Sequence, residues 1–594
     1  MSSKKWIILP NPPNDFVEKH PELPPTITRL LWNRNLRTQS DIDEFLNPDY
    51  SADLHDPFLF NDMPIATDMI FSAIADQKNI VVHGDYDADG VSAAAILITT
   101  LRRFGAENVS VFIPHREIDG YGLNENTVKL FQKEKIDLII TCDCGISNFP
   151  EIKLVKELGM KIIITDHHSI PEIIPPADAI IHPKMPNEKY PDKGLAGAAV
   201  AFKLVQGLLK KHKENNSKLP SGESHEAYEK WLLDMVAIAT IGDMVPLVGE
   251  SRTLTRYGLT VLNKTRNYGL QQLFIAAGIG DENGNPKHGA YDAETVGFQI
   301  VPRLNAAGRM DHANTAYALL MAESEKEGHK LAEKLNKNNT DRQKLTEKIM
   351  NEAKKQIAEQ NQADNPIIFV IGEDWPTGVL GLVSGRLKDQ FNKPAIAMGM
   401  AKGTIFGSGR SIVAFNLIAG LQSMPQFFDK FGGHPQACGF NLKNKELLED
   451  FKKTLSALVA KETKDIIMEP EILIDAQVDL EDVDWKLYDL LQKFEPFGQA
   501  NEEPKYAAYG LTVFEVNPIG QDGRHLKIMV KHNSHIIRKT IAFGLGDENR
   551  HPEKWKTTLK PGDKIDIVFS VSVNQWNGNR ELELKIEDIK KEAR

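Results

Sequence analysis

Residues 81–92 are Val-Val-His-Gly-Asp-Tyr-Asp-Ala-Asp-Gly-Val-Ser, and this stretch decides the fold and the chemistry that we expect of the chain. A short apolar run ends in His83, three alternating acids follow at Asp85, Asp87 and Asp89, and a helix is expected to begin there. One imidazole among several carboxylates suits a divalent cation that takes mixed nitrogen and oxygen ligands. The stretch therefore predicts a metal site at the end of a strand.

The alternation of strand and helix continues beyond this stretch. Short apolar runs that alternate with helical segments are typical of a parallel, doubly wound sheet. The expected strands are 79–83, 109–114, 137–143, 161–166 and 179–182. Such sheets bind ligands beyond the carboxyl ends of their strands, so polar residues at those ends are the candidates for a functional site.

Acids and imidazoles recur at three further element ends. Asp143 is at the end of the third strand, the triplet Asp166-His167-His168 begins at the end of the fourth, and Asp243 follows an apolar helix. Each alone has a structural explanation, since an Asp at a strand end is commonly a helix cap. Together they indicate two divalent metals that share a carboxylate, the arrangement that serves phosphodiester hydrolysis. The sequence has no Walker loop, which argues against a nucleoside triphosphatase.

The remainder of the chain predicts several further domains. A length of 594 residues exceeds what one core supports. Polar residues at helical spacing between 322 and 362 predict one or two long exposed helices that connect two lobes, and a smaller α/β segment is expected from 366 to 459. A small β-barrel is expected after 469, with strands at 511–516, 525–530, 536–543, 563–573 and 581–586 and a hairpin turn at 576–579.

Composition excludes some classes of protein. No apolar run approaches the roughly 18 residues that span a bilayer, and the three cysteines are too few for a disulfide framework. A cytoplasmic location without membrane contact is therefore expected. The net charge of -11 argues against nonspecific coating of nucleic acid but allows a local basic groove.

The four acidic motifs resemble those of the DHH phosphoesterase superfamily, which is named for the triplet found here at residues 166–168. Within it, the chain closely resembles the RecJ family of single-strand-specific 5′→3′ DNA exonucleases. The likeness covers most of the chain and includes Pro302–Met310, the glycine-rich stretches Gly407–Ser411 and Phe431–Phe440, and the segments Glu495–Gly498 and Gly523–Lys527.

This resemblance implies a multidomain α/β fold with five parts. The expected parts are an N-terminal segment that packs on the DHH domain (1–65), a parallel-sheet DHH catalytic domain (66–320), connector helices (321–364), a smaller α/β DHHA1 domain that binds substrate (365–465) and a C-terminal OB-type β-barrel that binds single strands (466–594).

The resemblance also implies a role for each motif residue. His83 and Asp87 would hold one metal, Asp143 would bridge, and the second metal would be held by Asp89, His167 and Asp243. The expected catalytic residues are His168, beside the scissile phosphate, and Asp166 and Asp85, which would orient ligands. Two Mn²⁺ ions are the expected cofactors, with Mg²⁺ as the alternative.

Substrate contacts are implied in two places. The candidates for gripping the 5′-terminal phosphate are Arg116, Arg309, Ser408 and Arg410, and His434 would line the substrate channel. Two departures from the family pattern stand out. Trp375-Pro376 occupies the place of a common Trp-His, and Gly498-Gln-Ala-Asn501 that of a common Gly-x-Gly-Asn.

By this resemblance the chain degrades single-stranded DNA to 5′-mononucleotides in recombination and repair. It would act as a monomer, with a single-strand-binding protein and a RecQ-type helicase as partners. One rival is a DHH-family hydrolase of short oligonucleotides, cyclic dinucleotides or pyrophosphate, which would not need the barrel after residue 469. The other rival is a non-catalytic replication factor that has lost its metal site, whereas every expected ligand is present here.

Overall fold

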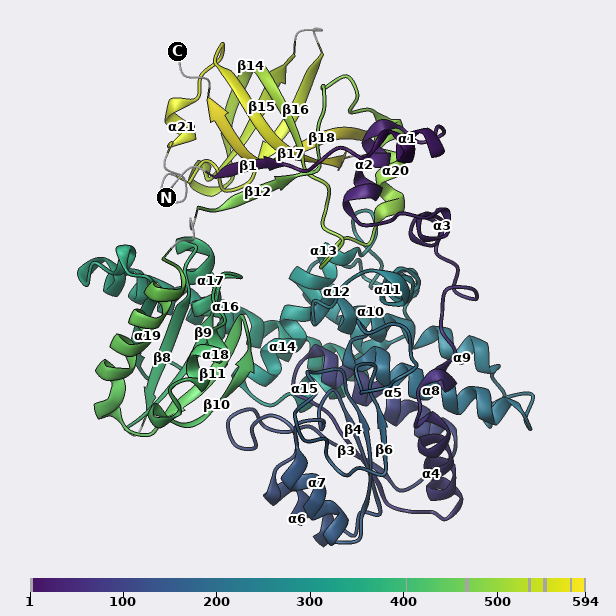
Figure 1. Cartoon of the computed structure of the whole chain (residues 1–594). Helices are drawn as coiled ribbons and strands as arrows, with labels where there is room; N and C mark the ends of the chain where they lie inside the picture. The colour runs from purple at the N-terminus through teal and green to yellow at the C-terminus, as the bar shows by residue number, and fades with distance from the viewer. Residues whose placement is uncertain are drawn as a thin grey trace. The chain divides into compact units, whose positions relative to one another are not determined.

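The structure is a computed structural model that describes residues 4–401, 403–464, 469–532, 536–547, 553–576 and 579–591 (Figure 1). Its contacts divide the chain into two compact units. Unit 1 comprises Met1–Thr38, Gln343–Lys493 and Glu503–Arg594, and unit 2 comprises Gln39–Arg342 and Phe494–Glu502. Each unit is described by itself.

Unit 2 contains the predicted parallel sheet, with strand order β3-β2-β4-β5-β6. All of its neighbouring strands pair in parallel. The strands are β2 (Ile80–His83), β3 (Val109–Phe112), β4 (Leu138–Cys142), β5 (Lys161–Thr165) and β6 (Ala179–Ile181). Their register pairs His83 with Thr141 and Cys142 with Thr165, so the carboxyl ends of β2, β4 and β5 lie side by side.

Helices cover both faces of this sheet because its strands are apolar on both faces. Val82, Ile140 and Ile163 belong to one core with helices α5 (Ala88–Arg103), α8 (Gly197–Lys213) and α10 (Leu233–Gly242). Their neighbours along the strands belong to a second core with α6 (Glu125–Lys133) and α7 (Phe149–Glu157). The other helices of unit 2 are α3 (Gln39–Leu46), η1 (Pro57–Leu59), α4 (Met63–Ala75), α9 (His225–Trp231), α11 (Gly249–Leu262), α12 (Tyr268–Ala276), α13 (Ala293–Thr295), η2 (Val296–Ile300), α14 (Val301–Met310) and α15 (Asn314–Leu320).

A single helix, α16 (Glu325–Glu359), runs along the chain from unit 2 into unit 1. The sequence predicted one or two exposed helices here. The helix instead buries Ala332, Leu335, Ile349 and Ala353, because an apolar residue recurs along its length at helical spacing.

Unit 1 contains a five-stranded mixed sheet of order β10-β11-β9-β8-β7, in which only β7 and β8 pair in parallel. The strands are β7 (Ile368–Glu373), β8 (Ala395–Ala401), β9 (Thr404–Arg410), β10 (Phe428–His434) and β11 (Ala437–Leu442). The accompanying helices are η3 (Gln362–Asp364), α17 (Thr377–Phe391), α18 (Leu417–Gln422), η4 (Pro425–Phe427), η5 (Lys445–Leu447) and α19 (Leu448–Glu462). This is the smaller α/β domain that the sequence predicts.

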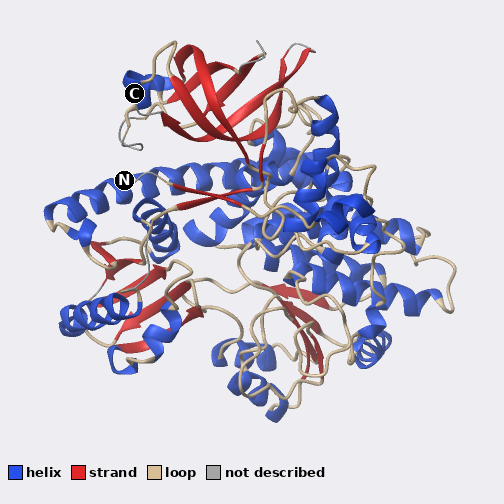
Figure 2. Ribbon diagram, turned by 45° about the horizontal axis from the view of Figure 1, so that its top comes forward, coloured by secondary structure: helices blue, strands red, loops and turns tan. Residues whose placement is uncertain are grey.

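Unit 1 also contains the predicted barrel, whose strands are red in Figure 2. The strands pair in the order β14-β15-β16-β18-β17, and β17 pairs again with β14, which closes the barrel. They are β14 (Tyr506–Ile519), β15 (His525–Lys531), β16 (Ile537–Ala542), β17 (Lys564–Trp576) and β18 (Asn579–Lys591). The minor elements nearby are β13 (Ala476–Gln477), α20 (Trp485–Leu491), η6 (Gln492–Phe494), η7 (Gln521–Gly523) and α21 (Trp555–Thr558). The hairpin turn predicted at 576–579 contains 577 and 578, which lie outside the described residues.

The N-terminal residues pair within unit 1. Strand β1 (Lys5–Ile8) pairs in parallel with β12 (Glu471–Ile474), and the Trp6 indole donates a hydrogen bond to Asp588 at 2.7 Å. Helices α1 (Asn14–Lys19) and α2 (Pro25–Asn33) follow. The first 38 residues therefore group with unit 1, whereas the sequence predicts that the whole segment 1–65 packs on the catalytic domain. Among the described residues, no helix has the length and apolar character needed to cross a membrane.

Candidate metal centre

The loop after β2 is held tightly over the start of α5. The Asp87 carboxylate caps this helix and accepts hydrogen bonds from the N–H groups of Asp89 and Gly90 at 3.0 and 3.1 Å. A Cβ on Gly90 would lie only 2.6 Å from the Asp85 backbone, so a glycine is needed there. Capping and close packing fix the three acids at the strand end.

Asp89 is buried against the N-terminus of α8. Its two carboxylate oxygens accept hydrogen bonds from the N–H groups of Gly197 and Ala198 at 2.7 and 2.6 Å. Helix N-termini favour negative charge, which explains how this carboxylate is accommodated. A Cβ on Gly197 would lie 2.5 Å from Asp143 Oδ1, so the glycine allows the helix to approach both acids.

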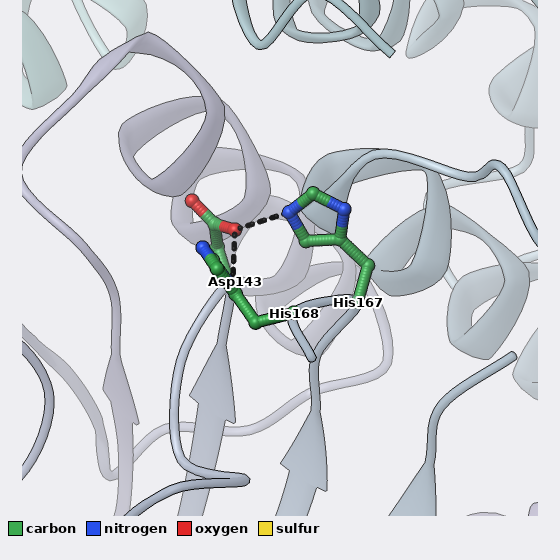
Figure 3. Close-up of side chains that lie close together, drawn as sticks. All are labelled: Asp143, His167 and His168. Atoms are coloured by element: carbon green, nitrogen blue, oxygen red, sulfur yellow. Dashed lines mark ion pairs between the residues drawn. The ribbon is translucent and has the colours of Figure 1, made fainter. Parts of the chain in front are cut away.

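The Asp143 carboxylate faces the imidazoles of both His167 and His168, as Figure 3 shows. His167 Nε2 is 3.2 Å from Asp143 Oδ1, 3.5 Å from Asp243 Oδ2 and 3.8 Å from Asp89 Oδ2. Among the residues that the structure describes, three groups have ligand atoms within 4.8 Å of one another, namely Asp143–His167–His168, Asp89–His167–Asp243 and Asp85–Asp87–Asp143. Asp143 belongs to two of these groups, so it lies between Asp85 and Asp87 on one side and His167 on the other.

The carboxyl groups of this cluster repel one another. Burial, together with the charge of Asp87, raises the pKa of Asp89 to about 7, and burial with Asp89 and Asp87 raises the pKa of Asp243 to about 8. Burial and neighbouring carboxylates also raise the pKa of Asp85 and Asp143 well above the usual range. A divalent cation would remove this repulsion.

Four buried polar atoms that make no hydrogen bond among the described residues are also suited to bind a metal ion. Within the described part of the chain, Asp85 Oδ1, Asp143 Oδ1, His83 Nε2 and His167 Nε2 are buried and make no hydrogen bond. Burial, with the charge of His168, lowers the pKa of His167 to about 3, so its imidazole is neutral, as metal ligation requires. Buried polar atoms normally have partners, so these atoms are suited to ligate a cation.

His168 and Asp166 form a charged pair beside the cluster. Asp166 Oδ1 lies 2.8 Å from His168 Nδ1 and accepts the backbone N–H groups of His167 and His168. Burial alone would lower the pKa of His168, but the hydrogen bond and charge of Asp166 raise it to about 9. Burial alone would raise the pKa of Asp166, but the same pair holds it below its usual range. His168 is therefore an imidazolium, and its Nδ1 lies 3.8 Å from Asp143.

His83 lies at the end of β2 but outside the three groups of ligand atoms found among the described residues. It is fully buried, its ring stacks on Phe112 with centroids 5.4 Å apart, and its Nδ1 is 3.6 Å from the Cys144 sulfur. The sequence predicted that His83 and Asp87 hold one metal with Asp143. Asp85 has a ligand atom close to those of Asp87 and Asp143, so it is a further candidate ligand beside His83.

Several residues around the centre were not singled out from the sequence. Two of the three backbone carbonyls of the triplet are bonded by the segment after β6, since His182 Nε2 lies 2.9 Å from His168 O and Lys184 Nζ donates to His167 O at 2.6 Å. Tyr121 bonds the Asp143 carbonyl at 3.1 Å, and Asn305 accepts from Ala88 N–H at 2.7 Å. His182 is the last residue of the predicted strand 179–182, and this position at a strand end is the signal that could have revealed it.

Arg116 and Arg309 lie close to the loop after β2. The Arg116 guanidinium lies 3.9 Å from the Tyr86 ring centre and donates to Gly308 O at 3.2 Å. A Cβ on Gly308 would lie 2.5 Å from Tyr86 O, so α14 touches this loop immediately before Arg309. The Pro302–Met310 segment thus supports the loop that carries the acids.

Ser408, Arg410 and His434 lie together in unit 1. Arg410 Nη1 donates to Ser408 Oγ at 3.3 Å, and the register places Ala437 opposite both Arg410 and His434. We expected the glycines of this region to admit a phosphate. Gly407 and Gly409 are needed for packing in the core. A Cβ on Gly407 would lie 2.4 Å from Phe440, and a Cβ on Gly409 would lie 2.6 Å from Leu417.

On the face of this sheet beside Ser408, no side chain of the described residues covers the backbone at two glycines. Gly439 is paired with Ser408, Gly432 with Gly439, and added Cβ atoms at these two glycines would meet nothing closer than 3.9 Å. Gly432 and Gly439 therefore leave the backbone open to an approaching phosphate.

The two departures from the family pattern have structural explanations. Trp375 is buried and its indole donates to Glu352 at 2.9 Å, while Pro376 precedes α17 as its N-cap. Gly498 and Asn501 close a turn through two backbone hydrogen bonds, with Ala500 at φ +60°. The backbone carbonyls of residues 494–496, just before this turn, accept hydrogen bonds from the buried Arg252 guanidinium. The motif is therefore bonded within unit 2 and is not one of the strands of the barrel.

Comparisons with known proteins agree with this architecture. Residues 79–240 match the N-terminal domain of the DHH family, 364–461 match the DHHA1 domain and 474–588 match the RecJ OB domain. The single-stranded-DNA-specific exonuclease RecJ of Bacillus subtilis is 35% identical over 99% of this chain and 71% of its own length. The RecJ of Thermus thermophilus is 30% identical over 96% of this chain and 76% of its own.

Solved structures give the same result. The structure of Thermus thermophilus RecJ in complex with Mn²⁺ matches 99% of this chain and 80% of that chain, with a TM-score of 0.80 and 28% identity. The Mg²⁺ complex of the same protein gives a TM-score of 0.74 with 26% identity over 99% of this chain and 79% of that chain.

Proposed function

The chain belongs to the RecJ family of single-stranded-DNA-specific exonucleases, and on that premise we propose that it removes mononucleotides from the 5′ end of single-stranded DNA. The observation that carries the proposal is the set of three overlapping groups of ligand atoms that share Asp143 and His167. Such a cluster is incomplete without divalent metal, and two metals close together serve the hydrolysis of phosphodiesters.

The proposed ligands of the two metals, which we take to be Mn²⁺, follow the geometry. Asp85 and Asp87 would hold one ion, Asp89, His167 and Asp243 would hold the other, and Asp143 would be shared between them. His83 keeps its predicted role as a further ligand, since its buried Nε2 has no partner within the described residues. When bound, the two ions activate a water molecule for attack on phosphorus and neutralise charge on the phosphate oxygens.

The protein's own groups then act on the substrate. The His168 imidazolium donates a hydrogen bond to a non-bridging oxygen of the scissile phosphate, and Asp166 keeps this imidazole charged and oriented. Arg116 and Arg309 bind phosphates next to the scissile one. The carbonyl contacts made by His182 and Lys184 keep the triplet in place.

Ser408, Arg410 and His434 form a second candidate phosphate site, which lies within unit 1. A guanidinium pairs with a terminal phosphate through two parallel hydrogen bonds, which suits recognition of a 5′ end. The barrel of unit 1 supplies the binding of single strands farther from the end. The chain acts as a monomer in recombination and repair, where a single-strand-binding protein and a RecQ-type helicase present its substrate.

Digestion of end-labelled strands tests this function. A 5′-labelled and a 3′-labelled single strand, each beside its duplex, are incubated with Mn²⁺ or with chelator. The expected result is release of labelled mononucleotide from the 5′-labelled single strand alone, and none with chelator. Release from the 3′ end first, or equal digestion of duplex, would contradict the proposal. Hydrolysis of dinucleotides or pyrophosphate without digestion of long strands would favour a small-substrate DHH hydrolase.

Two variants identify the site in the same assay. Asp143→Asn keeps the shape of the side chain and is expected to abolish release. Asp234→Asn is the matched control, because Asp234 is a buried acid on α10 that bonds Thr265 and lies outside the three groups. It is expected to keep wild-type activity.

A further inference from the structure

Two large apolar side chains are exposed beside the metal centre. Met244 directly follows Asp243 and is 69% exposed, and Phe298 in η2 is 76% exposed. Single exposed apolar residues are common on protein surfaces. The backbone conformation and the position of Met244 and Phe298 indicate that these two side chains have a function.

Met244 has a backbone conformation that disfavours its side chain. Its φ is +57°, the left-handed region that usually holds glycine directly after a helix C-cap. Among the described non-glycine residues with positive φ, only Met244 and Ala500 have apolar side chains. A strained residue next to a candidate ligand indicates that its side chain has a function, since a glycine would relieve the strain.

Phe298 lies on a π-helical turn that touches the end of α10. A Cβ on Gly297 would lie 3.7 Å from Ile241, and a Cβ on Gly242 would lie 3.0 Å from Val301, directly after η2. Such turns are rare and occur frequently at functional sites. The backbone segments that carry Phe298 and Met244 are therefore in contact at the turn that carries Asp243.

We propose that Met244 and Phe298 form an apolar platform that binds nucleobases of the single strand whose phosphate is at the metal centre. This inference rests on the proposed function. A base is attached to the same nucleotide as the phosphate, so bases must lie near the rim of the centre. Aromatic rings and the polarisable methionine sulfur bind the flat faces of all bases, which gives affinity without sequence preference.

The test compares strands with and without bases at the 5′ end. One 5′-phosphorylated strand carries normal nucleotides, and the other carries three abasic residues at its first three positions. Cleavage is measured as KM and kcat. Affinity is measured by fluorescence anisotropy on the same two strands with phosphorothioate linkages that resist cleavage. The full chain is used as wild type, Met244→Gly and Phe298→Ala.

Ala500→Gly and Ile65→Ala are the controls. Ala500 is exposed and has φ +60°, so its variant relieves the same kind of strain in the same unit. Ile65 is an apolar side chain on α4 with 49% exposure. Both are expected to keep wild-type affinity. Met244→Gly and Ala500→Gly are both expected to leave the melting temperature unchanged or raised.

The expected result is a base-dependent loss. Met244→Gly and Phe298→Ala each raise KM and Kd for the normal strand about 10-fold, with kcat and the values for the abasic strand nearly unchanged. Equal losses on both strands, or no loss on either, would overturn the platform. If wild type cleaves neither strand, the proposed function fails, and the anisotropy data alone decide the platform by the same two criteria.

Discussion

The metal centre of unit 2 and the Ser408–Arg410 face of unit 1 are both candidate phosphate sites, but they hold their charges differently. In unit 2, Asp89 and Asp143 are almost fully buried, and burial together with neighbouring carboxylates raises their pKa values. In unit 1, Arg410 is half-buried and bonds Ser408 and the Gly409 carbonyl.

This difference separates two kinds of site. Like charges buried together destabilise a fold unless a ligand compensates them, so the metal centre is coupled to the stability of its unit. Arg410 is a single charge that bonds a hydroxyl and a carbonyl, so we expect its unit to fold without a ligand. Changes at the metal centre should therefore alter stability as well as activity, and changes at Arg410 should alter activity alone.

Asp143→Asn should have the largest effect. Asparagine has nearly the same shape and tolerates the φ of +61° found here, so the fold is kept. Removal of the shared ligand is expected to lower the rate of strand digestion about 10³-fold or more. Removal of one repelling charge is expected to raise the melting temperature of the metal-free protein. A metal-free variant that melts below wild type would contradict this comparison.

Arg410→Ala should have a smaller and more selective effect. Loss of a charge-assisted hydrogen bond to phosphate costs about 1.5 to 3 kcal/mol, or about 10- to 100-fold in KM for a 5′-phosphorylated strand. Arg410→Lys keeps the charge but not the two parallel hydrogen bonds, and should fall between alanine and wild type. KM for a 5′-hydroxyl strand and the melting temperature should not change. An equal rise in KM for both strands would show that Arg410 does not bind the 5′ phosphate.

The pH dependence of stability should sharpen the comparison further. The pKa values of Asp89 and Asp243, about 7 and about 8 in the metal-free fold, lie above those of an unfolded chain. Protons therefore stabilise the metal-free fold at low pH, and this stability is lost as the pH rises through 7 and 8. The loss amounts to about 1.4 kcal/mol per pH unit for each proton.

Melting curves at pH 6, 7 and 8 measure this loss. With chelator the melting temperature should fall as the pH rises, and with Mn²⁺ the fall should disappear because the metal binds the deprotonated carboxylates. Arg410→Ala should keep the wild-type pH dependence with chelator. A flat profile for the metal-free wild type would contradict the raised pKa values.

The sequence predicted the parts of the structure that depend on local pattern. The five parallel strands, the mixed α/β domain and the barrel follow from short apolar runs, and the cluster of acids follows because parallel strands end at one edge. The role of Asp85 could not be predicted in this way. Asp85 and His83 are both on the same short stretch, and only side-chain geometry shows that a ligand atom of Asp85 lies close to those of Asp87 and Asp143.

Long-range pairings account for the other differences. Strand β1 has four residues and pairs with β12 more than 450 residues later, which no local pattern encodes. The Glu495-Pro496 motif lies within residues 474–588, which match the RecJ OB domain, but its carbonyls accept hydrogen bonds from Arg252 of unit 2, a long-range contact that no local pattern encodes. Gly407 and Gly409 likewise serve the core of unit 1, which their sequence does not distinguish from a phosphate loop.

Titration of the metal-free chain with Mn²⁺ at pH 8 by isothermal calorimetry tests the central claim most directly. The wild type and Arg410→Ala should each bind two Mn²⁺ ions per chain, and Asp143→Asn should bind fewer or bind much more weakly. No binding by the wild type, or unchanged binding by Asp143→Asn, would contradict a two-metal centre bridged by Asp143.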